Sequence, residues 1–547
     1  MPEFTDLVLC GYQGWFAAGI DNTLERWSHW SKRGEPGPGN TAFELYPDLR
    51  GYPQGALRQT GYGRLGNGQE SRLFGSERDG VIKLHFEWMR DYGIDGVALQ
   101  RFLQPTRTPK NRGWRNAVAG EARRQAEAHG KTFYIMYDIS GADWPAGHPT
   151  VVEEIRADVA DQLVGALDLM SSPSHARQGG KPVVAIWGFG FRDRKAPAGD
   201  ALATVNMLRD EFGCYVVLGV PYRWRDETGD SLPDWLPVYE SADMLIPWAV
   251  GRYKTSAELD GHINAIWGPD KEFCDARGID LQRVIFPGFA WSNLKSQQVA
   301  GARHALSRHA EAQADPAPRN SIKRHQGDFL WAQAFHVAQY GTSAFVAMFD
   351  EYDEATAIAK AAENVSMLPV DEYFLTLDAD GGNLPSDHYL WLTGELTKMI
   401  KNPAVATPQR PDRPDPPPID PSPPPSPEPT WTAPEARLVV QHAYLGLLGR
   451  AADANGLGHF ADRLTDGDTT ERFCQTLVSS DEFRNKNDGV PAAELAKRLY
   501  TKLLTRPEPQ IDAGGLAITI QAISSGMTAR RAARMLEGAE FRNRVLP

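Results

Sequence analysis

The segment Phe345-Val-Ala-Met-Phe-Asp-Glu-Tyr-Asp-Glu-Ala-Thr-Ala-Ile358 guides the interpretation of the whole chain, because an apolar run ends in four carboxylates within five residues. We interpret the run as a buried β-strand that brings Asp350, Glu351, Asp353 and Glu354 to one place. Burial and mutual repulsion raise carboxyl pKa values, so such a cluster can hold an acid beside a base. A solvated acidic loop is the simpler alternative, but the aromatic residues Phe349 and Tyr352 lie among the acids.

Working outward from this segment, short apolar runs rich in β-branched and aromatic residues recur along the first 355 residues. Including the acidic one, the eight predicted strands are Leu7–Tyr12, Gly96–Phe102, Thr132–Ile139, Pro182–Gly190, Cys214–Val220, Met244–Val250, Val284–Phe289 and Ala344–Asp350. Segments with helical spacing lie between most of them, and those at Asn116–His129 and Phe329–Tyr340 each end at a glycine. This alternation predicts a (β/α)₈ TIM barrel over residues 1–401, with a doubly wound sheet as the alternative.

Polar and aromatic residues gather where the predicted strands end, which is where such a barrel carries its chemistry. The candidate substrate-binding residues are Tyr12, Trp15, Trp30, Gln100, Arg101, Tyr137, Asp138, Tyr222, Trp248, Arg252, Trp291, Asp350 and Asp353. Tryptophans beside polar residues are typical of platforms that stack on sugar rings, although tryptophan is also common in protein cores. We expect Tyr12, Gln100, Tyr137, Trp248, Arg252 and Trp291 to line one cleft with the acids.

Composition excludes several other classes of protein. A net charge of −12 and a pI near 5.6 argue against a nucleic-acid-binding surface. The four cysteines, Cys10, Cys214, Cys274 and Cys474, are too far apart for a disulfide framework or a zinc site. No apolar stretch is long enough to span a membrane, and the first residues do not form a signal peptide. This predicts a cytoplasmic protein if the sequence is complete, and leaves a secreted or cell-surface protein open if it is a mature form.

The C-terminal part of the chain is organised differently. Residues 402–435 are rich in proline and predict an extended linker. Residues 436–547 then repeat themselves, since Tyr444-Leu-Gly-Leu-Leu-Gly-Arg450 corresponds to Tyr500-Thr-Lys-Leu-Leu-Thr-Arg506. We therefore expect a small all-α domain of two repeats, at 436–487 and 494–547.

The acidic segment resembles the signature of glycoside hydrolase family 99, the endo-α-1,2-mannosidases, within a wider family 71/99-like group. Other segments resemble that superfamily in the same order, over about residues 6–400: Gly11-Tyr-Gln-Gly-Trp-Phe16, Trp27-Ser-His-Trp30, Leu45-Tyr-Pro-Asp-Leu49, Tyr92-Gly-Ile-Asp-Gly96, Lys181-Pro-Val183 and Tyr389-Leu-Trp-Leu392. The chain departs from the family pattern at Asp350, Tyr352 and Asp353, where the family has Asn, Trp and His.

The resemblance implies a (β/α)₈ glycoside hydrolase that acts on an α-linked polysaccharide or oligosaccharide without a cofactor or catalytic metal. It places Glu351 as the base that deprotonates the sugar 2-hydroxyl and Glu354 as the general acid/base. The family retains configuration through a 1,2-anhydro sugar. The alternatives are an α-1,3-glucanase as in family 71, a non-catalytic glycan-binding protein, and an acidic site for Mg²⁺ or Ca²⁺.

The C-terminal repeats resemble the bacterial domain of unknown function 4214. The resemblance rests on Leu447-Leu-Gly-Arg450, Asn455-Gly-Leu457 and Ser480-Asp-Glu-Phe483. It implies a module for attachment to a cell-surface or protein partner and assigns no chemistry to it.

Overall fold

The computed structural model describes residues 2–19, 27–294, 319–414, 431–465, 470–524, 528–537 and 539–546. The chain divides into two compact units, Met1–Asp412 and Arg413–Pro547, and each is described by itself. Most of the predicted proline-rich linker, residues 415–430, lies outside the described residues.

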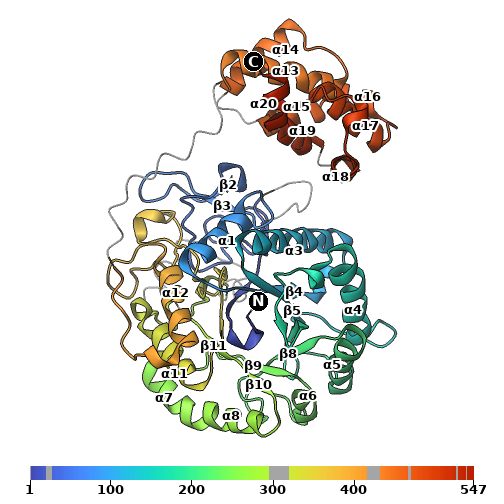
Figure 1. Ribbon diagram of the computed structural model, residues 1–547. Coiled ribbons are helices and arrows are strands. Elements are labelled where there is room, and N and C mark those ends of the chain that lie inside the picture. The colour runs from blue at the N-terminus through green and yellow to red at the C-terminus, as the bar shows by residue number, and fades with distance from the viewer. Residues whose placement is uncertain are drawn as a thin grey trace. The chain divides into compact units, whose positions relative to one another are not determined.

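The first unit is a barrel of parallel strands ringed by helices (Figure 1). Its strands are β1 (Val8–Tyr12), β4 (Gly96–Phe102), β5 (Thr132–Asp138), β7 (Lys181–Trp187), β8 (Tyr215–Val220), β9 (Met244–Pro247), β10 (Asp280–Leu281), β11 (Arg283–Ile285) and β12 (Ala344–Val346). The first and last strands are neighbours, since Cys10 of β1 is in register with Val346 of β12. The predicted (β/α)₈ barrel is therefore confirmed.

Between β9 and β12 the ring is completed by β10 and β11, which are two pieces of one strand. β10 pairs with β9, and β11 pairs with β12. Gln282 lies between the two pieces, and its N–H donates to the carbonyl oxygen of Leu245 in β9 over 3.0 Å. This hydrogen bond makes the ring continuous from β9 to β12.

Helices cover the outside of the ring and connect successive strands. They are α1 (Val81–Tyr92), α3 (Pro109–His129), α4 (Val151–Asp158), α5 (Ala198–Phe212), α6 (Leu236–Glu240), α7 (Ser256–His262), α8 (Gly268–Asp275), α11 (Asp328–Tyr340) and α12 (His388–Lys401). Their ends follow local sequence: α4 begins at a capping box of Thr150 and Glu153, and α3 ends at Gly130 in the left-handed conformation. Gly341 also ends α11, but its backbone is extended.

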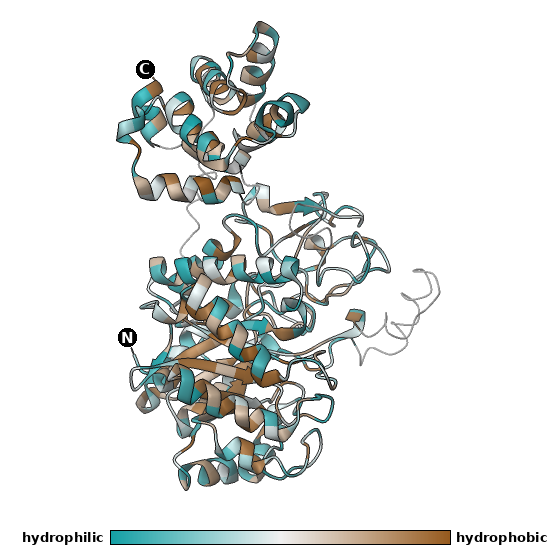
Figure 2. Cartoon of the chain, turned by 90° about the vertical axis from the view of Figure 1, so that its right-hand side faces the viewer, coloured by the Kyte–Doolittle hydropathy of each residue, from teal (hydrophilic) through white to brown (hydrophobic). Residues whose placement is uncertain are grey.

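The barrel interior is apolar, as the brown strands in Figure 2 show. Phe4 closes its amino-terminal end by contacting Tyr134 and Tyr215, with ring centroids 5.1 and 6.3 Å apart. A short antiparallel pair, β2 (Leu57–Gln59) and β3 (Arg72–Phe74), lies in the long connection between β1 and α1. That connection leaves the carboxyl end of β1, so it belongs to the same end of the barrel as the acidic segment.

All four cysteines lie within the described residues. Cys10, Cys214, Cys274 and Cys474 are all buried and form no disulfide. Within the described ranges, none of the helices combines the length and apolar character needed to cross a membrane.

The second unit is all-helical and packs around a core of its own. It contains α13 (Ala433–Ala443), α14 (Ala454–Thr465), α15 (Thr470–Val478), α16 (Asp481–Asn487), α17 (Ala492–Arg498), α18 (Ala513–Ser524), α19 (Thr528–Glu537) and α20 (Ala539–Val545). Its two sequence repeats make the same contacts. Arg450 pairs with Glu482 and lies 5.1 Å from the ring centre of Tyr444. The second repeat has the equivalent set of Arg506, Glu540 and Tyr500, at 5.0 Å.

We predict that Gly394→Ala destabilises the barrel. A Cβ at this position of α12 would lie 1.9 Å from the carbonyl oxygen of Tyr92, at the end of α1. Overpacking of this kind lowers the free energy of unfolding by about 1–3 kcal/mol. The matched control is Gly113→Ala in α3, where a Cβ meets nothing within 4 Å and alanine favours the helix. Urea unfolding followed by tryptophan fluorescence measures the free energy of unfolding of both variants. If Gly113→Ala loses as much stability as Gly394→Ala, the steric cause is contradicted.

Candidate active site

The acidic segment follows β12 directly and is held by backbone hydrogen bonds. The N–H of Phe349 donates to the carbonyl of Gly11 over 2.7 Å. Met348 then pairs with both Thr356 and Ile358, which folds residues 348–358 back on themselves. The four carboxylates therefore project from a fixed turn at the carboxyl end of the barrel.

A buried arginine holds the far side of this turn. The Nη2 atom of Arg324 donates to the carbonyl oxygens of Ala355 and Ala357, each over 2.8 Å. The N–H of Ala290 donates to the carbonyl of Glu354 over 3.0 Å. Burial lowers the pKa of Arg324, yet a guanidinium stays charged at neutral pH. The backbone of Glu354 is thus fixed from two directions.

Asp350 ties the acidic segment to the end of β1. Its two carboxylate oxygens accept the backbone N–H groups of Gln13, at 2.6 Å, and of Gly14, at 2.9 Å. Gly14 has a φ of +52°, which suits glycine. Burial raises the pKa of Asp350 to about 6, while the two backbone hydrogen bonds oppose this shift. Asp350 is therefore a positioning group, and its oxygens face the backbone.

Glu351 is buried and held by one side chain. The Nε2 atom of Gln13 donates to its Oε2 over 2.6 Å. Burial raises the pKa of Glu351 well above its ordinary value, and the charges of Asp353 and Glu354 add to the shift. The hydrogen bond from Gln13 acts in the opposite direction because it favours the ionised form.

Glu354 is the more accessible of the two glutamates. It is half-buried, and no described residue forms a hydrogen bond with its carboxylate. Burial raises its pKa to about 7. A carboxyl group of this kind keeps its proton close to neutral pH and can give it up, as a general acid must.

Asp353 anchors an aromatic wall beside these glutamates. Its Oδ2 lies 2.8 Å from Nδ1 of His29. The ring of His29 stacks on that of Trp15, with centroids 3.7 Å apart and planes 6° from parallel. His29 and Trp15 therefore reach the acidic cluster from the connection that follows β1.

Several buried polar atoms in this group lack a hydrogen-bond partner among the described residues. They are Gln13 Oε1, Trp15 Nε1, Glu351 Oε1 and Asp353 Oδ1. Native proteins rarely leave such atoms unpaired, because each one costs desolvation free energy. The set contains one N–H donor and three acceptors, which a ligand with several hydroxyl groups would satisfy.

Four of the predicted site residues turn away from this cluster into the helical layer. Strand side chains alternate between the two faces of a sheet, and the helix-facing set consists of Tyr12, Arg101, Tyr137 and Tyr222. Their partners lie on or beside the helices: His85 for Tyr12, Asp158 for both Arg101 and Tyr137, and His262 for Tyr222. The expectation that Tyr12 and Tyr137 line the cleft does not fit these contacts, so we assign all four a structural role.

The other candidates divide between the barrel mouth and its surroundings. Gln100 and Asp138 share the inward-facing rows of β4 and β5, and Trp248 packs on the ring of Trp187, 5.4 Å away. Trp291 follows Ala290, whose N–H donates to the carbonyl of Glu354.

Trp30 and Arg252 lie in the surroundings of the barrel mouth. Trp30 is fully buried and donates to the carbonyl of Phe74, and Arg252 is exposed and pairs with Asp230. Trp30 thus supports the wall, and Arg252 is held by an ion pair.

The sequence prediction missed Gln13, His29 and Trp187. Gln13 stands next to Tyr12, and strand alternation would have selected it, because Gly11 faces inward. His29 is part of the Trp27–Trp30 segment, but nothing local indicates that it reaches Asp353. Trp187 ends β7 in register with Asp138, which only the strand pairing reveals.

Asp350 and Glu351 of the acidic cluster face hydrogen-bond donors of the protein. In the part of the chain that the structure describes, no three His, Cys, Asp or Glu side chains converge so as to hold a metal ion. The hydrogen bonds of Asp350 and Glu351 are directed to Gln13 and Gly14 instead.

We predict that Glu354→Gln makes the protein more stable at high pH. The pKa of Glu354 is raised in the folded state, from 4.5 to about 7, so folding favours its protonated form. This contribution to stability is complete below about pH 4.5 and is lost as the pH rises through about 7. Glutamine stays neutral throughout. The variant should exceed the wild type by on the order of 2 kcal/mol at pH 8 and match it near pH 4.5.

Urea unfolding at the two pH values measures this difference. The control is Glu211→Gln, which removes an exposed ion pair with Arg156 and should change stability little at either pH. A Glu354→Gln variant that is less stable than the wild type at pH 8 would show that the ionised carboxylate is stabilised in the fold.

Comparisons with known proteins give the following result. Neither family models nor curated proteins match this sequence. Among solved structures, the chain is similar to two of a GH99 endo-alpha-mannosidase from Bacteroides thetaiotaomicron, one of them in complex with BIS-TRIS-propane. They are 13% identical, with TM-scores of 0.48 and 0.49, and cover 74% and 73% of this chain and 99% of theirs. A glycoside hydrolase-like protein is 12% identical, with a TM-score of 0.42, and the match covers 73% of this chain and 96% of that one.

Proposed function

We propose that the barrel is a glycoside hydrolase that cleaves an α-linked polysaccharide or oligosaccharide, with Glu351 and Glu354 as its catalytic pair. The observation that carries the proposal is the group of unpaired buried atoms around two carboxyl groups with raised pKa values. Hydroxyl groups both donate and accept, so a sugar would satisfy the N–H of Trp15 and the oxygens of Gln13, Glu351 and Asp353 together. The choice of an α-linkage comes from the resemblance of the acidic segment.

The two glutamates receive different roles. Glu354 is the proton donor to the departing glycosidic oxygen, since it is half-buried and has a pKa of about 7. Glu351 is the base, since Gln13 fixes one carboxylate oxygen and leaves Oε1 for the substrate. The raised pKa of Glu351 partly reflects repulsion by an ionised Glu354. When Glu354 is protonated this repulsion is absent, so the pKa of Glu351 falls, and the amide of Gln13 favours its ionised form further.

The reaction that we propose has two steps. Glu351 removes the proton of the sugar 2-hydroxyl, and that oxygen attacks the anomeric carbon while Glu354 protonates the leaving oxygen. The product is a 1,2-anhydro sugar. In the second step Glu354 deprotonates a water molecule, which opens the anhydro ring by attack at the anomeric carbon, and Glu351 returns the proton to the 2-oxygen. Each step inverts the anomeric carbon, so the overall reaction retains its configuration. Charge and protons balance over the cycle.

The helical unit receives a separate role in this proposal. It packs around its own core and repeats one set of contacts twice. We propose that it attaches the enzyme to a cell-surface or protein partner.

The experiment that tests the function is a screen of the purified chain against α-mannans, α-glucans and bacterial exopolysaccharides, with products identified by NMR. New reducing ends from an α-linked polymer would support the proposal, and an α-1,3-glucan as the sole substrate would favour a glucanase. Binding without turnover would identify a glycan-binding protein and overturn the enzymatic assignment.

We predict that the two glutamates differ in their dependence on the leaving group. Glu354→Gln should reduce kcat at least about a hundredfold for a natural linkage, because the proton donor is lost. An aryl glycoside of the same sugar needs little protonation and should be cleaved much better. Glu351→Gln removes the base, so no leaving group should restore its activity. Rescue of both variants by the aryl glycoside would contradict this division of roles.

We predict that Gln13→Met shifts the pH profile of kcat/KM. The amide of Gln13 lowers the pKa of Glu351, so its removal raises that pKa and reduces the ionised fraction of the base at a given pH. The acid limb should move to higher pH by about one unit. Gln339→Met, on the exposed part of α11, is the matched control. An unchanged acid limb in Gln13→Met would contradict a role for Glu351 as the base.

A further inference from the structure

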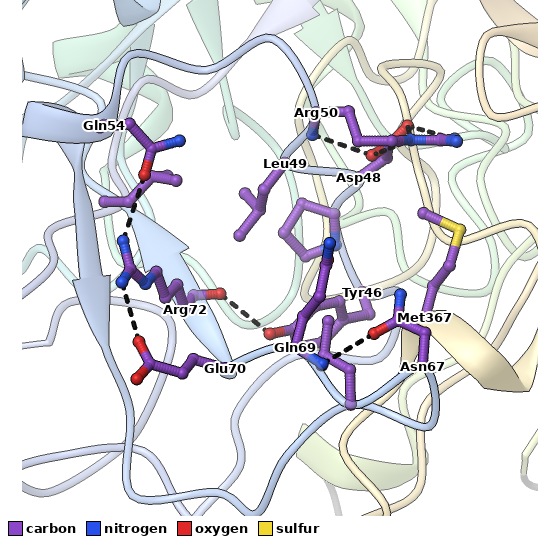
Figure 3. Close-up of a pocket in the computed structure, with 13 residues that line it drawn as sticks. Tyr46, Asp48, Leu49, Arg50, Gln54, Asn67, Gln69, Glu70, Arg72 and Met367 are labelled. Carbon is purple, nitrogen blue, oxygen red and sulfur yellow. Dashed lines mark hydrogen bonds and ion pairs between the residues drawn. The ribbon is translucent and has the colours of Figure 1, made fainter.

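A hollow lies at the same end of the barrel as the acidic segment, between the β2–β3 pair and the residues that follow β12 (Figure 3). We call it the β2–β3 cavity. Its volume is about 540 Å³, within the roughly 300–1,000 Å³ typical of small-molecule sites. Its apolar lining consists of Tyr46, Pro47, Leu49, Leu57, Leu65 and Met367.

The polar lining of the cavity is fixed by its own hydrogen bonds. Arg72 donates to Oε1 of Gln54 over 3.2 Å and to Glu70 over 2.8 Å. The Oδ1 atom of Asn67 accepts the backbone N–H of Gln69 over 3.0 Å. These bonds involve only the side-chain oxygens of Gln54 and Asn67. The side-chain NH₂ groups of these two residues have no hydrogen bond to a described residue. The side-chain amide of Gln69 has none at either end.

The charged side chains of the lining are matched in number. Arg50 forms a two-pronged ion pair with Asp48, at 2.8–2.9 Å, and Arg72 pairs with Glu70. Arg50 also pairs with Glu363, which lies outside the lining. An anionic ligand therefore meets no uncompensated cation in this lining, whereas an uncharged ligand with hydrogen-bonding groups meets three amides.

The cavity wall is bonded to the acidic segment. The N–H of Leu45, next to Tyr46, donates to the carbonyl of Tyr352 over 3.1 Å. The backbone N–H of Asp48 donates to the carbonyl of Lys360, just beyond the acidic segment, over 3.1 Å. Backbone hydrogen bonds thus join the cavity wall to the segment that carries Glu351 and Glu354.

We propose that the β2–β3 cavity is a second carbohydrate-binding site, which holds an uncharged sugar residue of the glycan on which the barrel acts. A pyranose presents an apolar face to Leu49 and Met367 and an edge of hydroxyl groups to the amides. The identity of the glycan rests on the proposed function. Occupation of both sites by one chain would raise the effective concentration of the polymer at the glutamates.

The test is affinity electrophoresis of the full chain in gels that contain soluble α-mannan, soluble α-glucan or a sulfated polysaccharide. The variants are Gln54→Ala/Gln69→Ala, which removes two exposed amides, and Leu49→Trp, which fills the cavity. The matched control is Gln339→Ala. Each variant is also made in the Glu351→Gln background, so that turnover does not remove the polymer during the run.

We expect one neutral polymer to retard the wild type and the Gln339→Ala control equally. The double amide variant should bind it about tenfold more weakly, because two hydrogen bonds are lost, and Leu49→Trp should bind weakly as well. On short oligosaccharides kcat should not change. Unchanged retardation of both cavity variants would overturn the proposal, and so would retardation by the sulfated polymer alone. Retardation that depends on the cavity in a protein without hydrolytic activity would support this site while refuting the proposed function.

Discussion

The carboxylate of Asp350 joins the first and last strands of the barrel at the point where the candidate site is built. It accepts two backbone N–H groups from the end of β1, while its own backbone continues from β12. Both oxygens are occupied in this way, so the buried anion is stabilised chiefly by backbone N–H dipoles, and the charge of Arg115 adds to this. The side chain of Gln13 then lies where it reaches Glu351. The geometry around Glu351 depends on this one link.

The crowding of buried carboxyl groups has two consequences: their pKa values are raised, and the turn that carries them needs hydrogen bonds to hold it. Each of Glu351, Asp353 and Glu354 has its pKa raised by burial, and the neighbouring anions add to the shift for Glu351 and Asp353. Ionisation of the cluster therefore opposes folding as the pH rises. Arg324 donates hydrogen bonds to two carbonyl oxygens of the turn. These bonds hold the acidic side chains in place despite the repulsion between their charges. At high pH these ionised carboxyl groups make the site less stable than amides would, and the same burial raises the pKa of Glu354 to about 7.

Much of the fold could be predicted from the sequence because barrel strands and helices leave local patterns. Runs such as Gly96–Phe102 are apolar and β-branched, and Gly130 ends α3 in the conformation that glycine favours. The acidic segment was equally visible, since its four carboxylates directly follow an apolar run in the sequence. The strand-end residues were predicted less well. Tyr12 and Gln13 are equally polar candidates, and only the direction of each side chain separates a helix contact with His85 from a hydrogen bond with Glu351.

The sequence by itself determined the alternation of strand and helix, the place of the acids at a strand end and the duplication in the helical unit. These features depend on residues that are near one another in the chain. The tertiary structure alone decided that Gln282 closes the ring on Leu245, that His29 reaches Asp353 across more than three hundred residues, and that the β2–β3 cavity has a balanced polar lining. The physical reason is that strand register and side-chain partners are set by hydrogen bonds between distant segments, and these form only when the barrel closes.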